Sequence, residues 1–170
     1  RELCLQIAGD LNDYSKYIDG LKILPVYGGS SIESQIRMLK TGVHIIVATP
    51  GRLIDLIERK VAKLETITDV VMDEADEMLN MGFKDELDKI LEATPKVKQT
   101  LLFSATFPRE VEDIARHYMT KPVEMSSGEK NKGSDQVSHQ YYVVSERNRY
   151  AALKRIADVN PDIYSIIFCR

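Results

Sequence analysis

The chain has 170 residues, of which 44% are hydrophobic and 29% charged, and its formal net charge is −3. That length allows one ordinary domain and part of a second, with enough apolar residues for a packed core. The slightly acidic balance excludes a strongly basic tail, so any nucleic acid must be bound through a few local groups. No apolar stretch approaches the length of a membrane span, and no signal peptide is visible, so we expect no membrane partner.

Short apolar runs alternate with segments of helical periodicity over residues 1–125, after an opening helical pattern that begins at Leu3. The expected strands are Ile23 to Tyr27, Val43 to Ala48, Val70 to Asp73, Thr100 to Ser104 and Val123 to Met125. The expected helices are Ile32 to Lys40, Arg52 to Arg59, Glu77 to Met81, Asp85 to Ala93 and Arg109 to Tyr118. Continuous apolar strands that alternate with helices predict an α/β fold with a parallel sheet covered on both faces.

Residues 126–136 are polar, contain two glycines and predict a flexible linker between two domains. The α/β pattern then restarts over residues 137–170. The elements expected there are a strand at Val137 to Ser145, a helix at Asn148 to Val159 and a strand at Ile163 to Phe168. We therefore expect a partial first domain at 1–125 and the first βαβ unit of a second domain at 137–170.

The two cysteines, Cys4 and Cys169, lie at opposite ends of the chain and form no CxxC pair. This spacing argues against a disulfide framework or a zinc site and predicts a reducing, cytoplasmic location. The sequence opens without a methionine and stops directly after the apolar run Ile166-Ile167-Phe168. We expect it to be a piece of a longer protein.

Three carboxylates in four positions, Asp73-Glu74-Ala75-Asp76, follow the apolar run at residues 70–72. Acids at the carboxyl end of a buried strand suit a nucleotide-hydrolysing site, where they hold Mg²⁺ and orient a water. The structural alternative is a simple helix start, because acidic residues in the first turn offset the helix dipole. These four residues alone do not decide between the two interpretations.

Thr49-Pro50-Gly51-Arg52 follows the second expected strand. Thr49 can cap the next helix and Pro50 suits its first turn, which is a sufficient structural explanation. The same geometry also fits one backbone phosphate, because free N–H groups, a hydroxyl and a guanidinium converge there.

Gly28-Gly29 and Ser104-Ala105-Thr106 also follow expected strands. The glycines indicate a tight turn or, alternatively, the close approach of a nucleic-acid strand to the backbone. The hydroxyls of Ser104 and Thr106 can cap the following helix or can pair with Asp76 across adjacent strand ends.

These motifs occur in one order, beginning with Arg-Glu-Leu at residues 1–3, and their spacing strongly resembles the DEAD-box ATP-dependent RNA helicases. The residues around Ile167-Phe168 are similar to the first motif of the family's second domain, so the resemblance covers essentially the whole chain. It implies a RecA-like fold of the P-loop NTPase type, ATP and Mg²⁺ as cofactors, and RNA as partner. Further protein partners would bind through terminal extensions that lie outside this sequence.

The resemblance also implies a role for each motif. Asp73 would hold Mg²⁺ through water, Glu74 would orient and activate the attacking water, and Asp76 would hydrogen-bond to Ser104 or Thr106. The RNA backbone would be contacted without base specificity by the groups at Arg1, Gly28, Gly29, Thr49, Pro50, Gly51 and Arg52. Such a protein unwinds or remodels short RNA duplexes locally, coupled to ATP hydrolysis.

Two family motifs are missing. The sequence contains no Gly-x-x-x-x-Gly-Lys-Ser/Thr, nor even a Gly-Lys pair, and it lacks the arginine-finger motif. Loss of an arginine finger alone can cost about 10³–10⁵ in rate, so we expect this chain by itself to be inactive. Two other interpretations are a different RecA-like nucleotide hydrolase and a non-catalytic remnant that binds RNA or protein.

Overall fold

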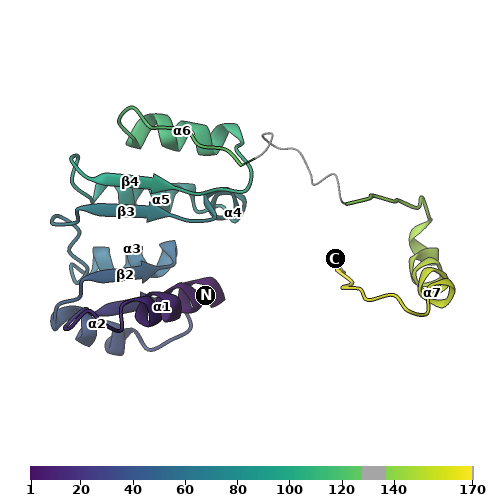
Figure 1. Cartoon of the computed structure of the whole chain (residues 1–170), viewed down its shortest axis with the longest axis horizontal. Coiled ribbons are helices and arrows are strands. Elements are labelled where there is room, and N and C mark those ends of the chain that lie inside the picture. Colours follow the sequence, from purple (N-terminus) through teal and green to yellow (C-terminus); the bar gives the residue numbers. More distant parts are fainter. Residues whose placement is uncertain (128–136, 170) are drawn as a thin grey trace. The chain divides into compact units, whose positions relative to one another are not determined.

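The computed structural model describes residues 1–127 and 137–169, which fall into two compact units (Figure 1). The expected linker at 126–136 lies outside the described residues except for its first two positions, and the domain limits stay a prediction. The first unit contains, in chain order, α1 (Glu2–Tyr14), β1 (Ile23–Val26), α2 (Ile32–Lys40), β2 (Ile45–Ala48), α3 (Pro50–Glu58), β3 (Asp69–Met72), α4 (Ala75–Asn80), α5 (Lys84–Glu92), β4 (Gln99–Leu102) and α6 (Arg109–Tyr118).

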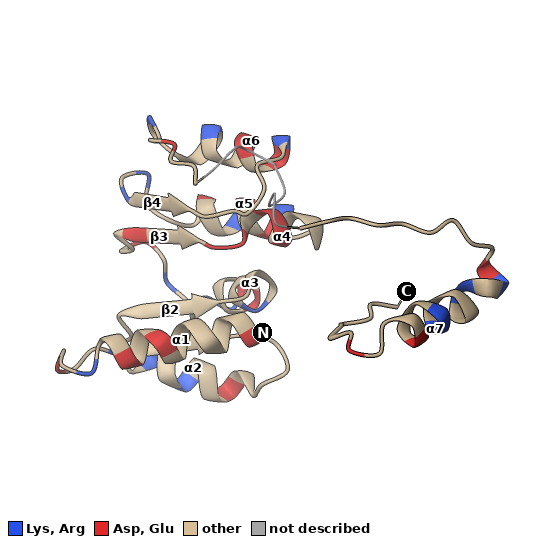
Figure 2. Ribbon diagram, turned by 45° about the vertical axis from the view of Figure 1, so that its right-hand side comes forward, with Lys and Arg blue, Asp and Glu red and all other residues tan. Residues whose placement is uncertain are grey.

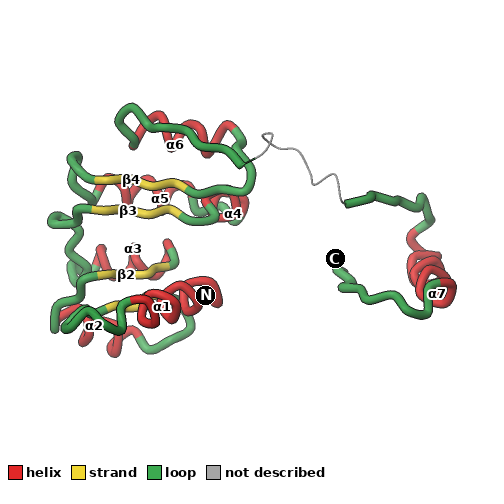
Figure 3. The backbone as a smooth tube through the Cα atoms, in the orientation of Figure 1, coloured by secondary structure: helices red, strands yellow, loops and turns green. Residues whose placement is uncertain are grey.

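The four strands of this unit form two parallel pairs rather than one sheet (Figure 3). Ile23 is opposite Ile45 in the β1–β2 pair, and Asp69 is opposite Gln99 in the β3–β4 pair. Among the described strands, β2 pairs only with β1 and β3 only with β4. All four arrows point the same way in Figure 1, so the carboxyl ends of the strands lie at one edge of the unit.

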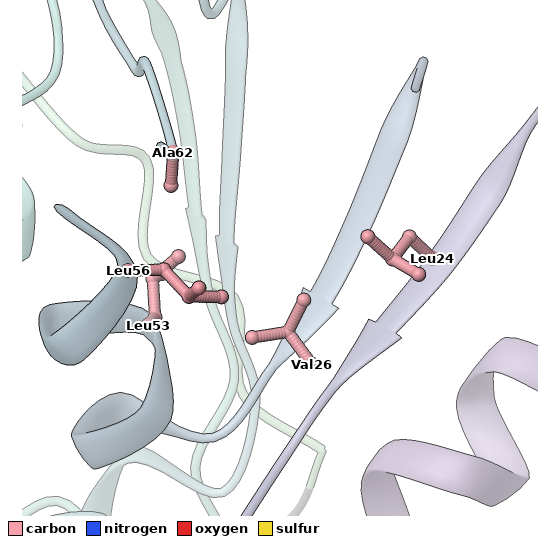
Figure 4. Packing of buried hydrophobic residues seen from close by; sticks show 5 residues of the cluster. All are labelled: Leu24, Val26, Leu53, Leu56 and Ala62. Carbon is pink, nitrogen blue, oxygen red and sulfur yellow. The ribbon is translucent and has the colours of Figure 1, made fainter. Parts of the chain in front are cut away.

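The first pair is covered by α3, whose apolar residues recur at helical spacing. Leu24 and Val26 of β1 form a buried cluster with Leu53, Leu56 and Ala62 (Figure 4). Val26 and Leu56 are fully buried, and burial of such side chains stabilises a fold by about 1.5–3 kcal/mol each. The cluster therefore fixes α3, and with it the Thr49-Pro50-Gly51-Arg52 segment, against the end of β2.

Helix α1 packs on the same pair of strands through Cys4 and Ala8, which are both buried. The thiol of Cys4 donates to the carbonyl oxygen of Val47 at 3.0 Å. Figure 1 shows α1 on one side of the strands and α3 on the other. This contact holds Arg1, at the start of α1, close to the carboxyl end of β1.

Among the described residues, helices cover just one face of the β3–β4 pair. Met72 packs with Leu87 and Leu91 of α5 and with Ile114 of α6. The alternate positions on the other face are exposed, and the residue Val71 is 59% exposed. Such uncovered apolar residues are unusual in parallel sheets, which are normally buried on both faces.

Three expected strands are wrong. The described residues at Val123 to Met125, Val137 to Ser145 and Ile163 to Phe168 form no strand. A strand is stable only when a neighbour accepts and donates its ladder hydrogen bonds, and none of these segments has one among the described residues. The second unit does form the expected helix, as α7 (Arg149–Val159) preceded by the 3₁₀ turn η1 (Glu146–Asn148), with no residue of α7 buried.

The remaining elements were predicted correctly in type and order. The helices at Ile32–Lys40 and Arg109–Tyr118 have the expected limits. The first, second and fourth strands are shorter than expected, and β3 keeps four residues but begins and ends one residue earlier, so Asp73 lies just beyond it. Within the described residues, no helix combines the length and apolar character needed to cross a bilayer.

Candidate functional site

The acidic motif forms a tight connection between β3 and α4. Asp73 and Glu74 are exposed, and Figure 2 shows acidic residues between these two elements. Glu74 adopts the left-handed conformation, with φ 53° and ψ 46°, and its N–H donates to Oδ1 of Asp73 at 3.0 Å. The next N–H, from Ala75, donates to the carbonyl oxygen of Phe103 at 3.1 Å. The acids are therefore fixed at the ends of both β3 and β4.

Asp76 joins the acidic motif to the hydroxyl motif. It is only 3% exposed, and its Oδ2 accepts from Oγ1 of Thr106 at 2.5 Å and from the N–H of Thr106 at 2.8 Å. Ser104 Oγ accepts from the N–H of Asp76 at 3.2 Å and donates to the carbonyl oxygen of Thr106 at 2.6 Å. The contact implied by the resemblance is confirmed, and neither hydroxyl caps α6.

This network keeps Asp76 ionised. The hydroxyl of Thr106 is the main cause that lowers the pKa of Asp76 to about 2, and it outweighs burial, which acts in the opposite direction. Oδ1 of Asp76 is buried and has no hydrogen-bond partner among residues 1–127 and 137–169. Asp76 also lies in the first turn of α4, so the helix-start interpretation is correct but incomplete.

Asp73 fits a magnesium ion that keeps most of its water. Its carboxylate is exposed and is oriented by the N–H of Glu74. The described part of the chain contains no group of three or more His, Cys, Asp or Glu residues that could hold a metal. Mg²⁺ is commonly bound by one or two carboxylates with water and substrate phosphates, so a single acid is sufficient. The phosphate groups of ATP do not find their usual cradle here, since no Gly-Lys pair exists.

The Thr49 segment begins α3 with Pro50 at the first turn, as predicted. Thr49 occupies the N-cap position of α3, but its side chain makes no capping hydrogen bond with the described residues. The backbone of Thr49 instead prolongs the strand, as its N–H donates to the carbonyl oxygen of Val26 at 2.9 Å. Thr49 and the exposed Gly51 therefore lie at a helix N-terminus, a place suited to an anion.

The two glycines differ in what their positions require. Gly29 has φ +80°, and a Cβ there would lie 3.3 Å from Nη1 of Arg1, so the predicted tight turn is confirmed. A Cβ on Gly28 would meet no described atom within 4 Å, and its φ is ordinary. The fold therefore requires glycine at position 29, whereas Gly28 lies beside open space.

The two arginines are held by groups that the sequence did not single out. Nη1 of Arg52 donates to the carbonyl oxygen of Ser30 at 3.1 Å and to Oε1 of Gln35 at 3.0 Å. The guanidinium of Arg1 lies 5.4 Å from the ring centroid of Tyr27, within the range of a cation–π contact. Gln35 could have been noticed as an amide three positions after Ile32 on the apolar face of α2.

The structure thus brings the predicted residues together as two groups at one edge of the first unit. Asp73, Glu74, Asp76, Ser104 and Thr106 lie at the ends of β3 and β4. The second group follows β1 and β2 and includes Arg1 through the loop contact: Arg1, Gly28, Gly29, Thr49, Pro50, Gly51 and Arg52. In open α/β sheets, ligands bind at this carboxyl edge of the strands.

Comparison with known proteins assigns the family. The family model described as DEAD/DEAH box helicase matches residues 1–114, and the chain belongs to that family. It is 42% identical over 170 residues to the DEAD-box ATP-dependent RNA helicase CshA of Streptococcus pneumoniae, covering 100% of this chain and 32% of that protein. The protein of the same name from Bacillus cereus gives the same identity and coverage.

Solved structures give the same assignment. A DEAD box protein from Methanococcus jannaschii is 41% identical, with a TM-score of 0.67 over 99% of this chain and 45% of that one. The yeast DEAD-box splicing factor Prp28 is 34% identical, with a TM-score of 0.72 over 93% of this chain and 37% of that one. The predicted α/β fold and the family resemblance are confirmed, and the chain spans 32% of the length of the curated relatives named above.

Proposed function

We propose that this chain belongs to an ATP-dependent RNA helicase that separates or remodels short RNA duplexes. The observation that carries the proposal is the bond between Asp76 and Thr106, which connects the acidic loop to the end of the neighbouring strand. A helix start needs no such partner. A hydrolytic site does need a rigid connection between the water-orienting acid and a segment that can respond to hydrolysis.

The acids divide the chemistry between them. Asp73 would hold Mg²⁺ through water, and the ion would neutralise charge on the phosphates when bound with ATP. Glu74 would accept a proton from the attacking water and orient it, since its carboxylate is exposed at the end of the strand. Asp76 does not react in this scheme; it fixes the loop that carries the other two acids.

The second group of residues would bind the sugar–phosphate backbone of one RNA strand. Thr49, Gly51 and the N-terminus of α3 offer a hydroxyl and N–H donors, and Arg1 and Arg52 supply positive charge. The open space at Gly28 allows a strand to approach the backbone closely. Because these groups contact no base edge, binding should be independent of RNA sequence.

Hydrolysis requires segments that these 170 residues do not supply, namely the phosphate cradle and the arginine finger. We therefore propose that the chain alone binds RNA weakly and does not turn over ATP. RNA-stimulated hydrolysis by the purified chain would contradict this. Unpaired cysteines at positions 4 and 169 support a cytoplasmic location, which fractionation of the source cells would test.

The decisive experiment replaces Glu74 with glutamine in a protein that carries this chain together with both missing segments. Glu74→Gln removes the base and keeps the shape, so RNA-stimulated ATP hydrolysis should fall at least about 100-fold while RNA affinity is retained. Glu65→Gln, at an exposed loop position, is the matched control and should change neither. Equal turnover in both variants would favour the non-catalytic interpretation.

A further inference from the structure

We propose that Gln35 is a positioning residue for RNA binding, which holds the turn at Gly28-Gly29 and the guanidinium of Arg52 in one fixed arrangement. The inference rests on the proposed function, because it assumes that Arg52 faces an RNA phosphate. It goes further because it assigns a role to Gln35, a neutral and buried residue that lies outside the motifs at Arg1, Gly28-Gly29 and Thr49 to Arg52.

Gln35 is inside the protein although it is polar. It is 5% exposed, and it is the buried residue of α2, whose other apolar positions pack on the first core cluster. An amide in such a place costs free energy unless its donor and its acceptor both find partners. Here both do: Nε2 donates to the carbonyl oxygen of Tyr27 at 3.1 Å, and Oε1 accepts from Arg52 at 3.0 Å.

Tyr27 and Arg52 belong to the two segments that form the proposed RNA surface. One is the loop after β1, with Gly28 and Gly29, and the other is the start of α3, with Thr49 to Arg52. The carbonyl of Tyr27 immediately precedes the glycine pair, and the Tyr27 ring also lies against the guanidinium of Arg1. Arg52 belongs to the first turn of α3. One side chain therefore fixes the spacing between the loop after β1 and the helix after β2.

The geometry at Arg52 leaves part of its guanidinium available. Both hydrogen bonds that the Arg52 side chain makes with described residues, to Ser30 and to Gln35, use Nη1. A guanidinium has five N–H donors in a rigid planar fork, so fixing one nitrogen orients the opposite edge. That edge can form two parallel hydrogen bonds to a phosphate. Because the Arg52 side chain is already ordered, little conformational entropy is lost on binding.

Among straight side chains of this length, only the amide can donate to Tyr27 and accept from Arg52 at the same time. A carboxylate would accept from Arg52 but repel the carbonyl oxygen of Tyr27, and an ammonium would donate to the carbonyl but repel Arg52. Methionine has nearly the shape of glutamine and can do neither. Gln35→Met therefore removes one of the two hydrogen bonds that hold Nη1 of Arg52, with little change in volume, and leaves the bond to Ser30.

The test measures binding of a fluorescein-labelled oligouridylate strand to the 170-residue chain by fluorescence anisotropy over a series of salt concentrations. Gln35→Met should weaken binding by about two- to tenfold, the cost of ordering one side chain on association. It should also reduce the slope of log affinity against log salt by up to about 0.7, the value of one phosphate contact on a single strand. Gln6→Met, at an exposed position of α1, is the matched control and should leave both quantities unchanged.

The salt slope separates positioning from general stability. A neutral residue that only supports the fold lowers affinity in proportion to the loss of folded protein and leaves the slope as it was, which would overturn the proposal. So would unchanged binding in Gln35→Met. If that variant melts below the assay temperature, Gln35→Asn decides instead, because its amide is too short to bridge both partners and should reduce the slope in the same way.

Arg52→Met separates this inference from the proposed function. If Arg52→Met leaves affinity and slope unchanged, the assignment of Arg52 to the RNA surface is wrong and the role of Gln35 is wrong with it. If Arg52→Met reduces both and Gln35→Met does not, only the role of Gln35 is refuted. In the double variant, Gln35→Met should reduce the slope no further than Arg52→Met alone.

Discussion

Replacing Thr106 with valine should destabilise the first unit in a pH-dependent manner. Valine keeps the branched shape of threonine but removes the hydroxyl that donates to Oδ2 of Asp76 at 2.5 Å. Asp76 is 3% exposed, so its carboxylate has little access to water that could replace that donor. A hydrogen bond to a charged group contributes about 1.5–3 kcal/mol, and we expect the free energy of unfolding to fall by about 2 kcal/mol at pH 7.

The pKa of Asp76 gives the sign and the scale of the effect, because the Thr106 hydroxyl is the largest of several groups that lower it. The network lowers that pKa from 3.8 to about 2, which corresponds to about 2 kcal/mol of stabilisation when the group is ionised. Since the folded pKa is below the unfolded one, this contribution is fully present above about pH 4 and is lost as the pH falls towards 2. Thr106→Val raises the folded pKa of Asp76 and so moves the acid-unfolding midpoint to higher pH.

Urea unfolding followed by circular dichroism between pH 2 and pH 7 measures the effect. The difference between the wild type and Thr106→Val should be largest at neutral pH and should shrink to about 1 kcal/mol or less near pH 2, where the bond becomes neutral. Thr66→Val, at an exposed loop position, should show a small difference that does not depend on pH. A difference for Thr106→Val that is equal at both ends of the range would refute the bond to an ionised carboxylate.

Two matched pairs of residues give further predictions. Gly29→Ala should lower the free energy of unfolding by about 1 kcal/mol, because of its positive φ and the nearby Arg1 guanidinium, whereas Gly28→Ala should be nearly neutral in the same urea assay. Equal losses would show that the turn is not strained. Cys4 should resist a brief treatment with iodoacetamide while Cys169 reacts, since burial raises the pKa of the Cys4 thiol. Mass spectrometry of the digested chain would show this, and rapid labelling of Cys4 would mean that α1 is not packed on its strands.

Much of the first unit could be predicted from the sequence because local pattern and tertiary packing agree there. The helix at Ile32–Lys40 has its apolar face and a serine cap at its start, and the structure places the side chain of Ser31 on the N–H of Ser34. The bond of Asp76 to Thr106 was implied by the family resemblance, and both residues follow apolar runs that become adjacent parallel strands.

The strands of the second unit could not be predicted because a strand depends on its neighbour. Val137 to Ser145 is rich in valine and tyrosine, which favour strands, yet pairing also depends on a neighbouring segment and not on those residues alone. A unit of this size also buries too little area to hold such pairs together. The division of the first unit into two parallel pairs has the same origin, since pattern indicates which segments are strands and not which of them are adjacent.

Gln35 was missed for a different reason. Its role depends on partners at positions 27 and 52, which are far apart in sequence and meet only in the fold. Thr49 shows the opposite case, in which a contact suggested by the sequence is not formed. It lies at the start of α3, but its side chain makes no capping hydrogen bond with the described residues. Local signals identify where a helix begins but not what its first side chains touch.

The backbone of Glu74, the residue that we propose to activate water, is held in an unfavourable conformation by the surrounding fold. A left-handed conformation costs an ordinary side chain about 1–2 kcal/mol, and neighbours on both sides maintain it through Asp73 and through the carbonyl oxygen of Phe103. Glycine and asparagine adopt this left-handed conformation at a lower energetic cost. If variants at position 74 were selected for thermal stability alone, glycine and asparagine should therefore be enriched. Such selection would remove the carboxylate that the proposed reaction needs.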